Sequence, residues 1–354
     1  MVRWVEFRWM KISAAVTLTA LSFWMTSPAE ARKPVAKTQL TKAQSAKASR
    51  AAKKPAPGVR SRGVIAVKGK RQAAKGRVVI RKPVEPPVLS VAQLAGLHGQ
   101  SDPLELRSAV ALVVDQDTNQ VLVSKNPDAV LPIASITKLM TALVVVEAGQ
   151  PMADLVSIGA EDVEATTNNR SRLSAGTEMS RGEMLRLALM SSENRAASSL
   201  SRHFPGGSPA FVAAMNRKAA QLGMRDTRYV EPTGLSPENR SSAKDLIVLV
   251  KAASNHQLIR ELSTSHDAQV SVGSRQVQFR NTNRLVTDPT WEIGLQKTGY
   301  IAAAGRCLVM QAQMAGRRLT MVLLDSAGKY SRLGDAERIR QWLSASAAAT
   351  PVVR

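Results

Sequence analysis

Three short segments of this 354-residue chain carry residues that together could catalyse acyl transfer. In chain order they are Ser135–Lys138, Ser192–Asn194 and Lys297–Gly299. The first offers a serine nucleophile with a lysine base, and the second offers another hydroxyl and an amide. The third offers a cation and a hydroxyl that can hold a carboxylate. We therefore expect a serine enzyme that works through a covalent acyl intermediate.

The Ser-x-x-Lys pattern is weak by itself, because it occurs three times: Ser135 with Lys138, Ser241 with Lys244, and Ser326 with Lys329. The second copy belongs to the capped start of a predicted helix, and the third lies in a predicted turn. Only the first copy precedes a run, 139–146, that is apolar enough to form a buried helix. At the head of such a helix the serine and lysine share one face, with Cβ atoms roughly 5 to 6 Å apart.

Lysine is the expected base of this site. The chain has four histidines, and none lies in a G-x-S-x-G or similar serine-hydrolase context. A lysine can accept a proton near neutral pH only if burial or a neighbouring cation lowers its pKa. We expect burial and the charge of Lys297 to lower the pKa of Lys138.

The second segment follows a predicted helix, where an exposed connection can present polar groups to a cleft. Ser192 is the candidate for relaying a proton between Lys138 and the leaving group. Asn194 is the candidate for orienting Lys138 and a substrate amide. Taken alone, the segment is more typical of a capping serine followed by a polar turn.

The third segment ends a predicted strand. Lys297 and Thr298 are candidates for binding a substrate carboxylate, and Gly299 allows a substrate backbone to approach the strand edge. The N–H groups of Tyr300 and Ser135 are candidates for an oxyanion hole. A single K-T-G usually marks only a strand end, so the three segments in this order carry the argument.

Hydrophobic patterning predicts the elements that must position these residues. Alternating and β-branched runs predict hairpins over 109–124 and 268–280 and strands over 291–298, 307–313 and 319–325. Helical spacing predicts helices over 135–147, 181–190, 209–222, 243–253 and 335–343. Strands at both ends of a helical middle indicate an α/β (α+β) fold, with one antiparallel sheet packed with a helical cluster.

The beginning of the chain resembles a secretory signal. A positive start, an apolar run over 12–25 and the segment Ala29–Ala31 predict a signal peptide over 1–31, and an uncleaved membrane anchor is the alternative. The mature chain is then expected to be periplasmic, with no transmembrane segment. Export also argues against a nucleic-acid partner.

Residues 32–87 are predicted to form a disordered basic linker. This segment has 17 Lys or Arg and a single acid, Glu85, so it carries +16 of the net charge of +22. It could bind an envelope polyanion or serve as a solvated tether. We expect one catalytic domain over 88–346 and a flexible tail over 347–354.

Neither cysteine chemistry nor a cofactor is expected. Cys307 is the single cysteine, lies in an apolar run and is predicted to be a small buried residue. No H-E-x-x-H motif or comparable metal cluster is present, and nothing indicates a nucleotide cofactor.

The chain resembles the penicillin-recognising serine acyltransferases, and most closely the low-molecular-mass D-alanyl-D-alanine peptidases of the endopeptidase type. The segments 132–140, 190–197, 281–283 and 296–300 carry the resemblance, which covers about 104–343. It implies attack by Ser135 on a D-alanyl carbonyl of peptidoglycan, an acyl-enzyme that water hydrolyses, and inhibition by β-lactams.

Three alternatives to an endopeptidase stay open at this point. D-alanyl-D-alanine carboxypeptidases share the motifs, although the 55 residues after Gly299 leave no room for the β-rich domain and amphipathic anchor of the common type. A class A-like β-lactamase would use Glu231 for deacylation, but the following Thr233–Leu235 is typical of the peptidases. A non-catalytic wall-binding protein predicts a broken motif, and none is broken.

Overall fold

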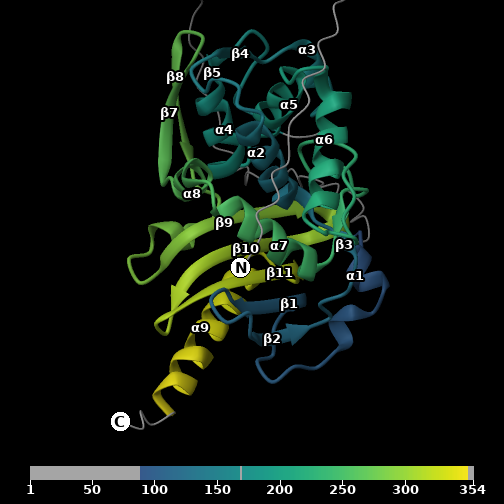
Figure 1. Ribbon diagram of the computed structural model, residues 1–354, viewed down its shortest axis with the longest axis vertical. Coiled ribbons are helices and arrows are strands. Elements are labelled where there is room, and N and C mark those ends of the chain that lie inside the picture. Colours follow the sequence, from purple (N-terminus) through teal and green to yellow (C-terminus); the bar gives the residue numbers. More distant parts are fainter. Residues whose placement is uncertain (1–87, 168–169, 350–354) are drawn as a thin grey trace, which may run out of the picture. The chain divides into compact units, whose positions relative to one another are not determined.

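A five-stranded antiparallel sheet forms the centre of the folded part of the chain (Figure 1). The computed structural model describes residues 88–167 and 170–349, so the expected signal peptide and basic linker lie outside the described residues. In spatial order the strands are β2 (Val121–Lys125), β1 (Ser108–Asp115), β11 (Arg317–Ser326), β10 (Gly305–Met314) and β9 (Glu292–Ile301). The sheet joins the beginning of the domain to its end, as the patterning predicts, and places β9 at one edge.

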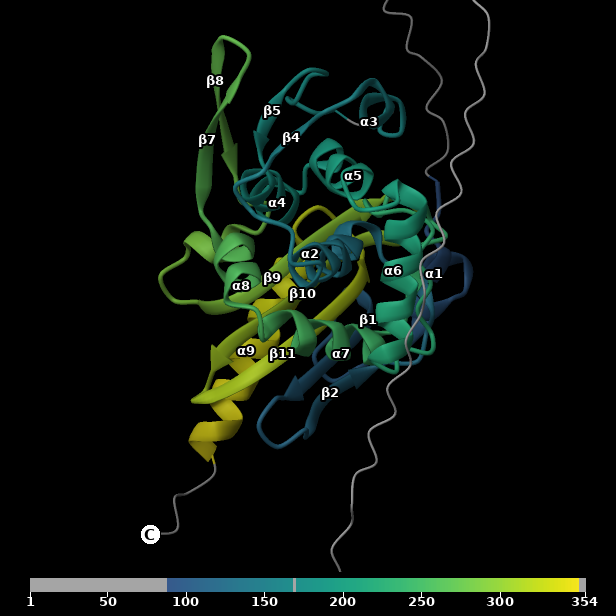
Figure 2. The same ribbon diagram turned by 45° about the horizontal axis from the view of Figure 1, so that its top comes forward.

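Helices cover one face of this sheet in a cluster (Figure 2). They are α2 (Thr137–Glu147), α4 (Arg181–Met190), α5 (Asn194–Arg202), α6 (Gly207–Gln221), α7 (Ala243–Ser254) and α8 (Gln257–Thr264). Helix α2 lies at the centre of the cluster, and its positions from Thr137 to Val145 are all buried. A helix that is apolar on every side is stable only inside a core, which explains this placement.

The opposite face of the sheet packs against the last helix, α9 (Ser331–Ala349). Strand alternation separates the two layers: Leu112 and Val322 belong to the core under the helical cluster, whereas Val113 and Met321 pack with α9 residues such as Ile339. The α/β fold expected from the sequence is confirmed. Helix α9 is longer than the predicted 335–343 and continues past the expected domain end at 346.

Short elements complete the described structure. They are helices α1 (Val91–Leu94) and α3 (Ala160–Glu164), the strand pairs β3 (Leu131–Pro132) with β6 (Arg240–Ser241) and β4 (Leu155–Ser157) with β5 (Glu178–Ser180), and the hairpin β7 (Asp267–Val272) with β8 (Arg275–Arg280). Four 3-10 turns lie at 97–99, 134–136, 284–287 and 302–304. The predicted hairpin over 268–280 is present, whereas α5, α8 and the two-residue strands are not predicted from the sequence.

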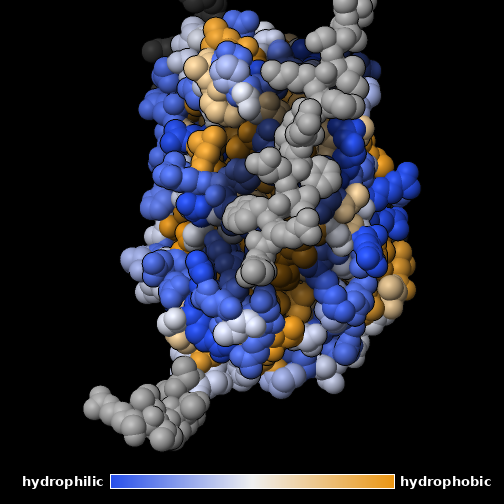
Figure 3. All heavy atoms as spheres, in the orientation of Figure 1, coloured by the Kyte–Doolittle hydropathy of each residue, from blue (hydrophilic) through white to orange (hydrophobic). Residues whose placement is uncertain are grey.

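Cys307 lies in β10 and is completely buried, as expected from its apolar run. On the face seen in Figure 3, hydrophilic residues predominate and hydrophobic ones show in small areas between them. Within residues 88–167 and 170–349, no helix combines the length and apolarity needed to cross a bilayer.

Candidate active site

Ser135 lies in the 3-10 turn 134–136 that leads directly into α2. The helix predicted to begin at Ser135 therefore begins two residues later, at Thr137, and Ala134 before the serine takes a left-handed backbone conformation with φ of +47°. Thr137 stabilises the turn, since its hydroxyl donates a hydrogen bond of 2.8 Å to the carbonyl of Ala134. Ser135 remains half-buried, so its hydroxyl is accessible at the end of a buried helix.

Lys138 is completely buried one turn later, and its ammonium group makes three hydrogen bonds. The Nζ atom lies 3.0 Å from Oγ of Ser135, 2.7 Å from Oδ1 of Asn194 and 2.6 Å from the carbonyl of Thr233. The first two partners are residues that the motifs predicted to meet. The fixed amine is within proton-transfer distance of the serine hydroxyl.

Burial lowers the pKa of Lys138 to about 7, although the carboxylates of Glu231 and Glu193 partly oppose this shift. The neutral amine is therefore well populated near neutral pH. Of the two causes predicted from the sequence, burial and the charge of Lys297, burial is the principal one. The pKa of Lys297 lies well below its usual value because of burial and the charges of Lys138 and Arg332.

Ser192 and Asn194 lie on the connection from α4 to α5, and Asn194 is the first residue of α5. Ser192 has a left-handed backbone with φ of +61°, which is uncommon for a serine and marks a tightly constrained position. Its Oγ accepts a hydrogen bond of 2.9 Å from Nζ of Lys297. The hydroxyl predicted to interact with Lys138 is thus bound to the other lysine.

Strand β9 brings the third motif against the serine turn. A Cβ atom on Gly299 would lie 3.0 Å from the backbone nitrogen of Ser135, so glycine permits this close approach. Lys297 is completely buried, and Thr298 Oγ1 lies 2.6 Å from Oγ1 of Thr282. Tyr300 projects outward with 56% of its surface exposed, and its ring stacks with the guanidinium of Arg306 at 4.4 Å.

The loop after Tyr229 contributes to the site without carrying a recognised catalytic motif. The carboxylate of Glu231 accepts hydrogen bonds of 2.6 Å from the backbone N–H groups of Thr233 and Gly234 and one of 2.9 Å from Asn239. These bonds fix the loop whose Thr233 carbonyl binds Lys138. A Cβ on Gly234 would lie 1.9 Å from the carbonyl of Ala134, so this loop also packs directly against the serine turn.

Arg332 of α9 also lies at the site, although no sequence motif predicts it. One guanidinium nitrogen lies 3.5 Å from the carbonyl of Gly299, and its buried Nε atom has no hydrogen-bond partner among the described residues. Burial lowers the pKa of Arg332, yet the group stays charged at any physiological pH. A cation with an unsatisfied buried donor beside Lys297 is suited to an anionic ligand.

The structure therefore brings Ser135, Lys138 and Asn194 into one hydrogen-bonded group and Ser192, Lys297 and Thr298 into another. Gly299 contacts the turn between them. Among residues 88–167 and 170–349, no group of three His, Cys, Asp or Glu side chains is placed to hold a metal ion. The chemistry available to the arrangement is nucleophilic attack by a serine with a buried amine as base.

Comparisons with known proteins agree with this geometry. Residues 98–328 match the D-alanyl-D-alanine carboxypeptidase family model. The D-alanyl-D-alanine endopeptidase of Pseudomonas aeruginosa is 48% identical over 241 residues, which cover 68% of this chain and 78% of that protein. The endopeptidase of the same name from Escherichia coli is 46% identical over 256 residues, covering 72% and 82%.

Solved structures share the fold. A mutant of a Streptomyces DD-transpeptidase superposes with a TM-score of 0.63 at 25% identity, covering 68% of this chain and 98% of that one. A D-alanyl-D-alanine carboxypeptidase from Mycobacterium tuberculosis superposes with a TM-score of 0.61 at 26% identity, covering 69% and 92%. The family resemblance predicted from the motifs is confirmed. The chain belongs to the D-alanyl-D-alanine carboxypeptidase family of serine peptidases.

Proposed function

We propose that this protein is a D-alanyl-D-alanine endopeptidase that hydrolyses peptidoglycan cross-links between D-alanine and a diamino acid. The contact of 3.0 Å between Nζ of Lys138 and Oγ of Ser135 carries the proposal, because the pKa of this buried lysine is about 7. The names of the two relatives with 48% and 46% identity support an endopeptidase.

Acylation begins when neutral Lys138 accepts the proton of Ser135. The serine oxygen then attacks the D-alanyl carbonyl and forms a tetrahedral intermediate. The backbone N–H groups of Ser135 and Tyr300 stabilise its oxyanion, and the close approach of Gly299 to Ser135 supports this arrangement. Asn194 orients both Lys138 and the substrate amide.

The leaving amine needs a proton before the peptide bond can break. Ser192 relays to this amine the proton that Lys138 took from Ser135: its hydroxyl hydrogen passes to the substrate nitrogen while its oxygen takes up the proton of Lys138, so that Lys138 is neutral again. The hydrogen bond from Lys297 holds the Ser192 oxygen in place. The acyl-enzyme on Ser135 is then hydrolysed by water, with Lys138 again as base. A β-lactam would acylate the same serine.

Lys297, Thr298 and Arg332 bind the carboxylate beside the scissile bond. Arg332 offers a buried donor without a partner among the described residues, and Lys297 has its ammonium 2.8 Å from the carbonyl of Thr298. A terminal D-alanine and the D-centre of a cross-linked diamino acid both place a carboxylate at this position. Carboxypeptidase activity is therefore the second candidate, favoured by relatives such as the Bacillus subtilis carboxypeptidase at 31% identity.

Two other functions are less well supported. A β-lactamase would need Glu231 free to activate water, whereas its carboxylate is occupied by the loop that it holds. A wall-binding protein without catalysis would not need Lys138 and Lys297 buried beside two serines, because burial of amines is unfavourable without a compensating function.

We place the protein in the periplasm, with a signal peptide over 1–31, a basic linker over 32–87, a catalytic domain over 88–346 whose last helix continues to Ala349, and a tail within 347–354. The match of residues 98–328 to the D-alanyl-D-alanine carboxypeptidase family model lies within the proposed catalytic domain. We further propose that the linker, with its charge of +16, binds an envelope polyanion.

The deciding experiment incubates the mature protein with cross-linked muropeptide dimers and uncross-linked pentapeptides and follows both by mass spectrometry. Loss of dimers identifies an endopeptidase, and loss of only the terminal D-alanine identifies a carboxypeptidase. A Ser135→Ala variant is the control. Products that form equally with this variant would contradict an acyl-enzyme on Ser135.

A further inference from the structure

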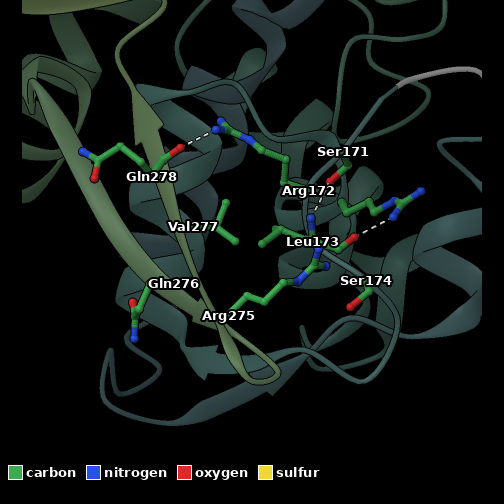
Figure 4. A pocket seen from close by; sticks show the side chains of 9 residues that line it. Ser171, Arg172, Leu173, Ser174, Arg275, Gln276, Val277 and Gln278 are labelled. Atoms are coloured by element: carbon green, nitrogen blue, oxygen red, sulfur yellow. Dashed lines mark hydrogen bonds between the residues drawn. The ribbon is translucent and has the colours of Figure 1, made fainter.

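A cavity of about 580 Å³ lies between the segment 171–174 and strand β8 (Figure 4). One wall is formed by Arg275–Gln278 of β8, and the opposite wall by Ser171–Ser174 together with Arg195 of α5. In Figure 4 the side chain of Arg275 extends from β8 across the cavity toward Leu173. We call this the arginine pocket.

The arginine pocket is strongly cationic. Its lining includes Arg172, Arg195 and Arg275 but no acidic residue. None of the three forms an ion pair with a described residue. Three guanidinium groups around one cavity repel each other, so the arrangement favours an anion that offsets this repulsion.

Two of these arginines are held in fixed orientations. Arg172 donates to the carbonyl of Gln278, and its guanidinium stacks 3.9 Å from the ring centre of Phe279. Arg195 donates a hydrogen bond of 2.5 Å to the carbonyl of Leu173. Arg275 is exposed and makes no such contact among the described residues, which leaves its whole fork available to a ligand.

The arginine pocket is connected to the candidate active site from two directions. Arg195 directly follows Asn194, the residue that binds Lys138. The hydroxyl of Ser171 donates a hydrogen bond of 2.7 Å to the carboxylate of Glu193. The pocket wall is thus joined to the same connection that presents Ser192 and Asn194.

The second connection runs along β8. This strand ends at Arg280, and Thr282 soon after it lies 2.6 Å from Thr298 between their hydroxyl oxygens. Thr298 belongs to the group proposed to bind the carboxylate beside the scissile bond. From Arg280 back to Arg275, the length of β8, is about 17 Å of extended chain. A single D-alanine leaving group is too short to span this distance, whereas a peptide stem of several residues together with the long Arg275 side chain can span it.

We propose that the arginine pocket binds a free carboxylate of the peptide stem that leaves when a cross-link is cut. This inference rests on the proposed function. It explains how the enzyme could bind cross-linked substrates more tightly than uncross-linked ones. Arg275 supplies the main contact, with Arg172 and Arg195 contributing positive charge. The glycan strands are not the ligand in this proposal, because the pocket selects for anionic groups.

Binding to the Ser135→Ala protein tests the proposal without turnover. We expect a cross-linked dimer with free carboxylates to bind roughly five- to tenfold more weakly after Arg275→Ala. The same dimer, with its stem carboxylates amidated except for the one beside the scissile bond, should bind weakly to both proteins, so that the loss of Arg275 makes no further difference. Arg275→Lys keeps the charge without the bidentate fork and should give an intermediate affinity.

Arg225→Ala is the matched control, because it removes an equally exposed arginine from the turn after α6. Equal weakening by this variant would show a general charge effect and overturn the proposal. Equal affinity for acid and amidated dimers would also overturn it, and displacement of the dimer by polyphosphate would then identify an envelope phosphate as the ligand.

The outcome separates this inference from the proposed function. Dimer binding that depends on Arg275 supports the arginine pocket even if the active enzyme trims only terminal D-alanine. Cleavage of dimers by the wild-type enzyme with no change in KM after Arg275→Ala overturns the pocket and leaves the endopeptidase intact. Thermal unfolding of each variant establishes that its fold is retained.

Discussion

Lys138 donates a hydrogen bond of 2.6 Å to the backbone carbonyl of Thr233, a residue 95 positions later in the chain. The amine is therefore held between the serine turn and a loop that contributes no catalytic side chain of its own. Its position depends on Glu231, which fixes Thr233, and on Gly234, which packs against Ala134. The position of the proposed base therefore depends on a segment that is distant in the sequence.

The rate of acylation should depend on the protonation of Lys138. Because burial lowers its pKa to about 7, the neutral fraction increases as pH rises through this value. The second-order rate constant with a fluorescent penicillin should therefore increase with pH up to about 7, level off, and fall again at the higher pH at which Lys297 loses its proton. A rate that keeps rising toward the ordinary lysine value near 10.5 would contradict a depressed pKa.

Gly234→Ala should disrupt the serine turn. Gly234 has φ of +82°, and a Cβ there would lie 1.9 Å from the carbonyl of Ala134. We expect acylation to fall by about a hundredfold, since small displacements of reacting groups are that costly. Gly223→Ala is the control, because its φ is +76° but nothing lies within 4 Å of the added atom. It should cost about 1 to 2 kcal/mol of stability and leave acylation unchanged.

Glu231→Gln should weaken the loop under Lys138 without affecting deacylation specifically. The amide replaces one acceptor oxygen by a donor that faces the N–H of Thr233 or Gly234. We expect the free energy of unfolding to fall by about 1 to 3 kcal/mol and acylation to slow. The lifetime of the penicilloyl-enzyme, followed by mass spectrometry, should be unchanged. Glu238→Gln, an exposed change in the same loop, should leave the free energy of unfolding, the acylation rate and the penicilloyl-enzyme lifetime unchanged.

A large selective increase in the lifetime of the penicilloyl-enzyme after Glu231→Gln would instead assign this carboxylate a role in deacylation. That result would favour the β-lactamase alternative. The two measurements are independent. The free energy of unfolding depends on how well the loop is held, whereas the lifetime of the penicilloyl-enzyme depends on how well water is activated to attack the ester.

Arg332→Ala should weaken the binding of substrates that carry a carboxylate beside the scissile bond. Its buried donor without a described partner and its position 3.5 Å from the carbonyl of Gly299 place a positive charge there. We expect KM for an acidic substrate to rise about tenfold and the preference over its methyl ester to disappear. Arg318→Ala removes an exposed arginine at the start of β11 and should change neither value. If KM for the methyl ester rises as much as KM for the acid, recognition of the carboxylate charge by Arg332 is ruled out.

The removal of Arg332 should also change Lys297. The charge of Arg332 helps to lower the pKa of this lysine, so Arg332→Ala should raise that pKa. A lysine with a raised pKa keeps its proton to higher pH. The decrease of kcat at high pH is therefore expected to begin at a higher pH in Arg332→Ala than in the wild-type enzyme. Measurement of kcat as a function of pH above neutrality would detect this shift.

Much of the architecture follows from patterns that are local in the chain. Alternating runs predict the strands of the central sheet, and the apolar run after Lys138 predicts the buried helix α2. The sequence order of the three motifs also predicts which residues meet. The contact between Lys138 and Asn194 is an example, although 56 positions separate them.

The rest depends on tertiary contacts that leave no local pattern. The left-handed backbone of Ala134 moves Ser135 into a 3-10 turn, and the reason lies in packing against β9 and Gly234. Arg332 reaches Gly299 from the first turn of α9, a contact between helix and strand that no local pattern in the sequence indicates. Thr233 acts through its carbonyl, a group that every residue has.

The burial of Cys307 in β10 has a consequence for the protein's redox behaviour. Burial raises the pKa of its thiol to about 12, so the reactive thiolate is almost absent at neutral pH. The folded protein should then neither form mixed disulfides nor react with alkylating reagents in an oxidising environment. Labelling of this single thiol requires the sheet to open, and its rate would measure how often the native molecule exposes its interior.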